Sequence, residues 1–268
     1  MVTALPADEA VRLLTDGTLH LQGRLRGASN TTLRATVSLG DVSLRCVYKP
    51  ISGERPLWDF PDGTLAGREV AAYRVSAATG WDIVPPTVLR DGPLGPGACQ
   101  LWIDTQRSIS RARLGFVPAD AVPAGWYPVA AAADDDGAEY VLAHADDPDL
   151  ARMALLDVVI NNADRKGGHV LHARDGSLRG VDHGVSFHVD DKLRTVLWGF
   201  VGQAIPPTEV AVLAALRAAL RGPLRDELCP LLHAEEIEAT AARLDRVLAA
   251  GVFPRPRPGR HAMPWPPI

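Results

Sequence analysis

The first hundred residues of the chain contain short runs in which apolar and polar residues alternate, the pattern typical of half-buried strands. Gly40-Asp41 separates two of these runs and is a hairpin turn signal. We expect a short helix before the runs, at residues 7–15, and a longer helix between them, from the N-cap candidate Thr64 to Ala78. The predicted strands are residues 19–25, 31–39, 42–48, 84–89 and 98–103.

The pattern changes after Asp104. Residues 105–137 show no clear period and are predicted to be irregular, whereas beyond them apolar residues recur at helical spacing. From Phe253 the chain is rich in proline and basic residues, and we expect it to be extended and partly disordered. The predicted helices begin near Asp149 and at residues 208–221, 224–233 and 235–250.

A strand-rich first part followed by a helix-rich second part predicts an α+β fold with two unequal lobes and a cleft between them. The expected boundaries are an N-terminal lobe at residues 1–104, a C-terminal lobe at 105–252 and a proline-rich tail at 253–268. The length of 268 residues suits such a pair of lobes, and 47% hydrophobic with 22% charged residues is ordinary for a globular protein with a full core.

Charge and cysteine content narrow the functional classes. A net charge of −4 without a basic stripe gives no indication of nucleic-acid binding. The three cysteines are far apart and show neither metal-ligand spacing nor a disulfide framework. The sequence starts without signal-peptide character and has no apolar stretch of about 18 residues, so we expect a cytoplasmic protein without integral membrane association.

The most informative segment is Asp164-Arg165-Lys166-Gly167-Gly168-His169, followed by Asp182-His183-Gly184. Phosphoryl transfer needs a carboxylate that orients the attacking hydroxyl, a cation on the migrating phosphate and ligands for a divalent metal. Asp164 is the candidate for the first role and Lys166 for the second. His169 and Asp182 are the candidate metal ligands. Each residue alone could be a solvated loop charge, but the set in this order favours catalysis.

Two features upstream fit the same chemistry. Lys49 ends a β-branched run and Glu69 follows twenty residues later in a predicted helix, the arrangement that holds a lysine on ATP phosphates. Glu54 is a competing partner for Lys49. The loop at residues 23–30 offers Gly27 for close backbone approach to phosphates, with Ser29 and Asn30 as side-chain donors, although an ordinary hairpin would have the same composition.

These motifs resemble the protein-kinase-like superfamily, in its atypical branch of phosphatidylinositol 3-/4-kinases and HipA-like kinases. Asn162-Ala163-Asp164 is similar to the Asn-x-Asp part of that branch's catalytic loop. Residues 53–64 and 161–169 resemble an actinobacterial family labelled as phosphatidylinositol 3-/4-kinase-related, and the similarity extends to about residue 250. The family label itself says little about the substrate.

The resemblance implies a two-lobed kinase fold that binds ATP with Mg²⁺ or Mn²⁺. Lys49 and Glu69 would anchor phosphates, Asp164 would be the catalytic aspartate, and Asp182 would have the role of the metal-binding aspartate of an Asp-Phe-Gly motif. His169 departs from the family's asparagine, and because imidazole is a softer ligand we expect Mn²⁺ to serve better than Mg²⁺. Alternatively, His169 only hydrogen-bonds Asp182 or Asp164. We expect adenine near Gln100, Trp102 and Ile103.

The predicted function is therefore ATP-dependent phosphoryl transfer to a hydroxyl acceptor. Protein Ser/Thr is preferred, because nothing in the sequence favours a membrane, and a lipid or small-molecule alcohol stays open. A nucleotide-binding pseudokinase and an AMP transferase on the same fold are the alternatives. Asp157, in an apolar helix, either bonds the backbone of the catalytic loop or faces solvent. A zinc site at His172, His183 and His188 is disfavoured, because no cysteine partners them.

Overall fold

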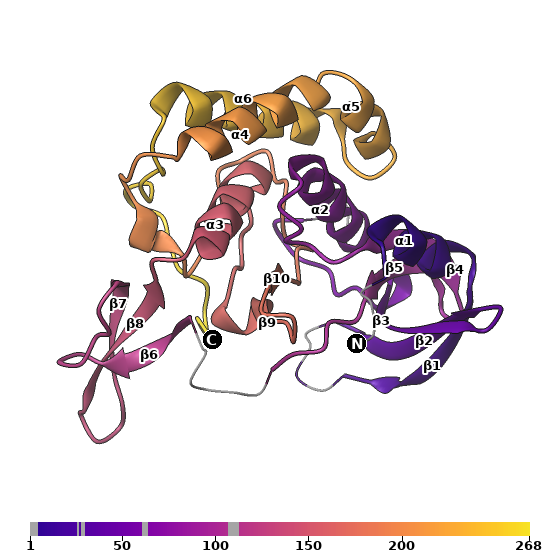
Figure 1. Cartoon of the computed structure of the whole chain (residues 1–268), viewed down its shortest axis with the longest axis horizontal. Coiled ribbons are helices and arrows are strands. Elements are labelled where there is room, and N and C mark those ends of the chain that lie inside the picture. The colour runs from indigo at the N-terminus through magenta and orange to yellow at the C-terminus, as the bar shows by residue number, and fades with distance from the viewer. Residues whose placement is uncertain (1–4, 26, 28–29, 61–63, 107–112) are drawn as a thin grey trace.

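The computed structural model describes residues 5–25, 27, 30–60, 64–106 and 113–268. Its first part is a five-stranded antiparallel sheet with the strand order β1-β2-β3-β5-β4 (Figure 1). The five predicted strands are all present, with shifted ends. They are β1 (Thr18–Arg24), β2 (Leu33–Leu39), β3 (Val42–Pro50), β4 (Thr87–Gly92) and β5 (Gly95–Leu101).

One face of this sheet is covered by helix α1 (Ala7–Asp16). Leu14 of α1 packs with Val37, Tyr48 and Cys99, which alternate with residues of the opposite face along their strands. The guanidinium of Arg90 donates to the carbonyl of Leu14, in the last turn of α1, and to that of Gly17, which follows the helix. The helix predicted at residues 7–15 is therefore present, and its apolar side packs on the sheet.

Helix α2 (Leu65–Thr79) covers the other face and is buried along most of its length. Val70 packs against Ala98 of β5, while the far side of α2 meets the C-terminal helices. Gly67 allows this approach, because a Cβ there would lie 2.9 Å from the carbonyl oxygen of Leu231. A buried ion pair of 2.6 Å between Arg68 and Glu236 fixes α2 to helix α6. A helix held from both sides is a rigid carrier for Glu69.

The second part is built on helix α3 (Pro148–Ile160), whose N-terminus is capped by the Asp147 carboxylate. A layer of three helices lies over α2 and α3 (Figure 1). A short hairpin follows α3 and comes back beside it. The helices of the layer are α4 (Pro207–Ala219), α5 (Pro223–Leu228) and α6 (Ala234–Ala250), and the hairpin strands are β9 (Val170–His172) and β10 (Leu178–Gly180).

The prediction of an irregular segment at residues 105–137 was wrong for the residues that the structure describes there. Strands β6 (Leu114–Pro118), β7 (Trp126–Ala133) and β8 (Glu139–Ala145) form an antiparallel sheet in the order β6-β8-β7, which projects from the C-terminal part (Figure 1). Alanine-rich β7 has little intrinsic strand preference. Its pairing with β8 decides its structure, and local pattern cannot show this.

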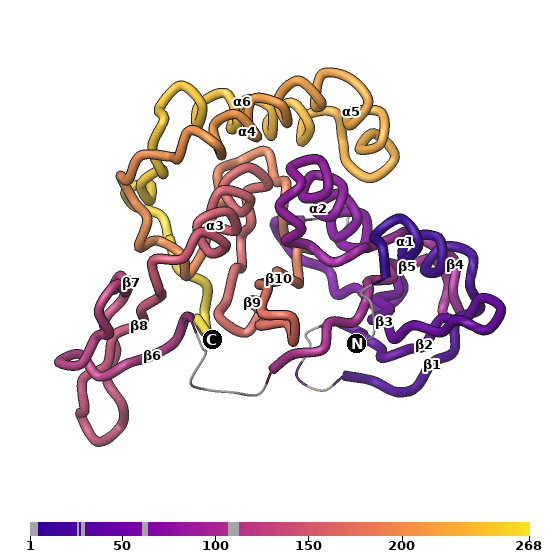
Figure 2. The backbone as a smooth tube through the Cα atoms, in the orientation of Figure 1, coloured from indigo at the N-terminus to yellow at the C-terminus, as the bar shows by residue number. Residues whose placement is uncertain are grey.

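The tail beyond Phe253 contains no long element, yet it packs closely on the second part of the chain. Phe253 is buried and its ring lies 5.4 Å from that of Phe200. The carbonyl of Ala262 accepts a hydrogen bond from the Trp198 indole, and that of Pro267 accepts one from Gly167 N–H. The tail therefore runs past α3 toward β9 (Figure 2). The expected partial disorder is not seen. The prolines prevent the tail from forming a helix or strand, but they do not prevent it from packing on the rest of the protein.

Across the residues with a described structure, no helix combines the length and apolarity that crossing a bilayer requires.

Candidate functional site

Lys49 lies at the centre of the candidate site. In the register of β3 and β5 it is opposite Ala98, so its side chain leaves the sheet on the side that α2 covers. Its ammonium contacts the Glu69 carboxylate on α2 and lies 2.9 Å from Asp182 Oδ1. The second oxygen of Glu69 accepts the backbone N–H of His183 at 3.1 Å. Glu69 thus connects the sheet to the loop after β10.

The charges at this point stabilise one another. Burial opposes the charged form of Lys49, but the carboxylates of Asp182 and Glu69 outweigh it and raise the Lys49 pKa. The Lys49 ammonium in turn lowers the pKa of Asp182, whose side chain is exposed to solvent. Asp182 has a left-handed backbone (φ 63°), a conformation that is uncommon for residues other than glycine and concentrated at functional sites. Both groups are therefore held charged around neutral pH.

Glu54, the competing partner for Lys49, has another role. Its carboxylate accepts the N–H groups of Leu65 and Ala66, at 3.2 and 2.8 Å. These are first-turn donors of α2 that Thr64 does not cap with its side chain. Glu54 therefore acts as a helix cap supplied from a distant turn, which the spacing of the sequence does not indicate.

The loop after α3 presents Asp164 and Lys166 to the same region. Asn161 ends α3 in a left-handed conformation (φ 55°), and the Asn162 side chain accepts the N–H of Asp164 at 3.0 Å. The Lys166 ammonium lies 3.4 Å from Asp164 Oδ2. Burial raises the pKa of Asp164, while the charge of Lys166 partly offsets this rise. A carboxylate with a raised pKa is suited to accepting a proton from a hydroxyl.

Asp157 anchors this loop from below and is fully buried with its partner Arg165. The Arg165 guanidinium meets the carboxylate at 2.9 to 3.1 Å, donates to the Val181 carbonyl at 3.1 Å, and contacts His183 Nε2 at 2.6 Å. Asp157 therefore does not face solvent, and its carboxylate meets the loop through the side chains of Asn162 and Arg165 rather than through the loop backbone. The pair connects α3, the Asp164 loop and the Asp182 loop in one network.

His169 and Asp182 face each other, with Nε2 and Oδ2 3.3 Å apart. Burial lowers the pKa of His169 to about 4, so its imidazole is neutral at pH 7. A neutral imidazole and a carboxylate both ligate divalent ions. No group of three or more His, Cys, Asp or Glu side chains suited to a metal occurs in the described ranges, which include the disfavoured histidine cluster. The two residues fit an ion that takes its remaining ligands from nucleotide phosphates and water.

A cavity of about 600 Å³ opens between the sheet and the loops of the second part. Gly27 and Asn30 of the predicted phosphate loop line it, and Ser29 lies outside the described residues. Arg194 also lines the cavity and its charge lowers the pKa of Asp164, yet the sequence analysis did not single it out. No motif marks this arginine. The predicted site residues that share the cavity are Gly27, Asn30, Lys49, Glu69, Asp164, Lys166, His169 and Asp182.

The predicted adenine contacts lie apart from this cavity. Gln100 is buried, and its amide donates to the Thr87 hydroxyl at 2.9 Å. The Trp102 N–H donates to the Arg45 carbonyl at 3.0 Å. The expectation for Gln100 therefore needs correction, because its side chain is engaged inside the first lobe. Trp102 and Ile103 are half-buried and do not line the cavity.

The fold of the chain is kinase-like. The Golgi casein kinase structure superposes with a TM-score of 0.54 at 12% identity, over 91% of this chain and 75% of that chain. The Helicobacter pylori proinflammatory kinase CtkA gives a TM-score of 0.44 at 12% identity, over 90% of this chain and 94% of that one. No family model matches the sequence.

The chain belongs to the family of Protein Rv2133c from Mycobacterium tuberculosis. The two sequences are 49% identical over 266 residues, which cover 97% of this chain and 95% of the relative. The superposition on the Golgi casein kinase supports the kinase-like fold that the resemblance implied, whereas the narrower phosphatidylinositol-kinase label receives no support.

Proposed function

We propose that the protein is an ATP-dependent phosphotransferase that moves the γ-phosphate to a hydroxyl acceptor. The observation that carries this proposal is the convergence of Lys49, Glu69, Asp164, His169 and Asp182 on one cavity between two parts of a kinase-like fold. These groups supply the cation, the carboxylate and the ligand types that phosphoryl transfer requires.

The proposed roles follow from the charges. Lys49, kept protonated by two carboxylates, would hold ATP phosphates, with the backbone around Gly27 and the amide of Asn30 on their other side. Asp164 would orient the acceptor hydroxyl and accept its proton. Lys166, beside Asp164, would offset the negative charge on the migrating phosphate.

His169 and Asp182 would hold the divalent ion, which supplies charge neutralisation between the β- and γ-phosphates when bound. Because an imidazole nitrogen favours transition metals, the proposed site works better with Mn²⁺ than with Mg²⁺. The variant His169→Asn, which restores the ligand of the resembled catalytic loops, is expected to raise the Mg²⁺-to-Mn²⁺ activity ratio. An unchanged ratio would remove His169 from the metal site.

The acceptor is a hydroxyl compound, and protein Ser/Thr is the class predicted from the sequence. Adenine would enter the cavity between the sheet and the second part.

The test combines binding with turnover. Thermal shifts with ATP and Mn²⁺ or Mg²⁺ are measured for the wild type, Lys49→Met, Asp164→Asn and the exposed hairpin control Asp41→Asn. We expect Lys49→Met to lose the shift. Asp164→Asn should keep it and lose about 10²- to 10⁴-fold of transfer rate, the usual contribution of a general base. No nucleotide shift in the wild type would overturn the proposal.

The same experiment separates the alternatives. If the protein binds nucleotide but shows no turnover that Asp164→Asn reduces, it is a pseudokinase. This is the second candidate because His169 stands where the resembled catalytic loops have asparagine. Mass spectrometry of the product distinguishes transfer of phosphate from transfer of AMP.

A further inference from the structure

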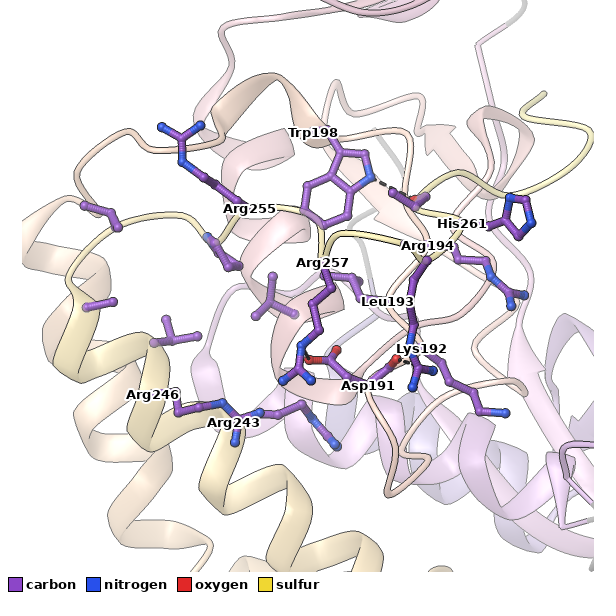
Figure 3. Close-up of a pocket in the computed structure, with 18 of the residues that line it drawn as sticks. Asp191, Lys192, Leu193, Arg194, Trp198, Arg243, Arg246, Arg255, Arg257 and His261 are labelled. Carbon is purple, nitrogen blue, oxygen red and sulfur yellow. Dashed lines mark hydrogen bonds and ion pairs between the residues drawn. The ribbon is translucent and has the colours of Figure 1, made fainter.

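A second cavity, of about 510 Å³, lies beside the candidate site on the C-terminal part. Its walls are the last turns of α6, residues 191–198 and the tail between Val252 and Ala262. The close-up shows Arg243, Arg246 and the Arg257 guanidinium near one another, whereas Arg255 extends away from them on the side of the Trp198 ring (Figure 3). We call this cavity the arginine pocket. It exists only because the tail folds back onto α6.

The lining of the arginine pocket carries an unusual charge. The formal net charge of the whole chain is −4, yet Asp191 is the only acidic residue among those that line this pocket. The cationic lining residues are Lys192, Arg194, Arg243, Arg246, Arg255, Arg257 and Arg260. Cations gathered in a concavity focus a positive potential and attract anions strongly.

Some of these cations already have partners. Arg257 pairs with Asp191 at 2.6 Å and Lys192 with Asp59 at 3.0 Å, while Arg243 donates to backbone carbonyls. Others have none: the ion pairs found among the described residues do not include Arg194, Arg246 or Arg255. Arg194 acts on the nearby charge of Asp164. Among the described residues, Arg246 and Arg255 are therefore the guanidinium groups of this pocket without a counter-charge.

The shape and the charge together define the ligand class. A volume of about 510 Å³ is within the range of roughly 300 to 1,000 Å³ of small-molecule sites. Guanidinium groups bind phosphate through paired, charge-assisted hydrogen bonds. Several such groups in one pocket match a molecule with two or more phosphates.

Arg194 connects the arginine pocket to the catalytic cavity, because its side chain lines both. Its backbone N–H donates to the Asn162 carbonyl at 2.9 Å, and its carbonyl accepts from Arg165 N–H. Arg194 is therefore fixed to the loop that carries Asp164. A molecule held by the pocket's arginines would have its unphosphorylated end directed toward this loop.

We propose that the arginine pocket binds the phosphate groups of a polyphosphorylated small molecule and presents a hydroxyl of that molecule to Asp164. The inference rests on the proposed function for its catalytic half. The acceptor oxygen forms a bond to the γ-phosphorus as the bond from that phosphorus to the β-phosphate oxygen of ADP breaks. The hydroxyl proton passes to Asp164. The products are ADP and an acceptor with one more phosphate.

Binding is tested first, without ATP, by titration calorimetry with inorganic tripolyphosphate. The variant is Arg246→Ala/Arg255→Ala, whose residues lie outside the catalytic cavity, and the matched control is Arg12→Ala/Arg174→Ala, two exposed arginines elsewhere. We expect tripolyphosphate affinity to fall about tenfold or more in the variant and to stay unchanged in the control. Equal affinity in variant and control would overturn the proposal.

Two further probes identify the source of the phosphates. Sugar bisphosphates represent soluble ligands, and phosphatidylcholine vesicles with and without phosphatidic acid represent a lipid phosphate. If sugar bisphosphates or vesicles with phosphatidic acid bind the wild type more tightly than the Arg246→Ala/Arg255→Ala variant, the pocket recognises phosphate, and the ligand that binds identifies the source. If neither probe binds and a multiply phosphorylated peptide binds the wild type more tightly than the variant, the proposal that the ligand is a small molecule is overturned.

Transfer is then compared between sugar bisphosphates and the same sugars without phosphate. We expect the variant to lose about tenfold or more in kcat/KM for the phosphorylated acceptors, while its ATP thermal shift equals that of the wild type. Equal rates in variant and wild type would overturn the acceptor role. Failure of the proposed function is distinguishable from failure of the pocket proposal. If the proposed function is wrong, the wild type shows no thermal shift with ATP, whereas tripolyphosphate binding can still be measured.

Discussion

Replacing Asp157 by asparagine would leave the Arg165 guanidinium buried without its counter-charge. Both side chains are completely inaccessible to solvent. The carboxylate also accepts from Asn162 at 3.0 Å and from the Thr195 hydroxyl at 3.3 Å. An asparagine has the same shape, but its amide nitrogen would face several of these donors, so the substitution removes charge and acceptors without opening a cavity.

The expected cost follows from the burial. Breaking a buried ion pair by removing one partner typically costs about 3–5 kcal/mol, since the remaining charge cannot return to water. Globular proteins have unfolding free energies of about 5–15 kcal/mol, so Asp157→Asn should remove about a fifth or more of the total. A double variant, Asp157→Leu/Arg165→Met, removes both charges. Its cost should be below the sum of the single costs by about 1–3 kcal/mol.

The assay is urea unfolding followed by tryptophan fluorescence, with Glu227→Gln as the matched control. Glu227 pairs with Arg74 at 3.4 Å on the surface, where loss of a partner should cost less than about 1 kcal/mol. A cost for Asp157→Asn as small as that of the control would refute the reasoning that the buried pair holds the two loops together.

Glu54→Ala should lower the unfolding free energy by about 1 kcal/mol, because it removes the acceptor of two first-turn N–H groups of α2; a loss seen equally with Glu54→Gln would point to charge rather than capping. His144 is buried, its Nε2 accepts Gly199 N–H at 3.0 Å, and burial lowers its pKa. The unfolded chain therefore binds the extra proton first, so stability should be lost as the pH falls below about 6.5. Denaturant melts of His144→Gln should show a weaker loss between pH 7 and 5 than the wild type, and parallel pH profiles would contradict this assignment.

Local pattern was sufficient for the elements whose cores are built from neighbouring residues. The strands of the first sheet alternate, α1 and α6 carry apolar stripes, and Asp147 caps α3 as its position predicts. It was insufficient for β6, β7 and β8, because a strand of alanines depends on its partners. The same limit hid the capping role of Glu54 and the placement of Gln100, since both depend on contacts from elsewhere in the fold.

The order of charged residues along the chain determined which groups could perform phosphoryl transfer, because Lys49, Glu69, Asp164 and Asp182 have spacings that a kinase-like fold can bring together. Only the tertiary structure decided what surrounds them. Asp157 acquired a buried partner, and the tail, which by composition alone could have been disordered, acquired a surface to pack on. The arginine pocket follows from that packing: arginines that lie far apart in the sequence share one hollow only when α6, residues 191–198 and the tail meet.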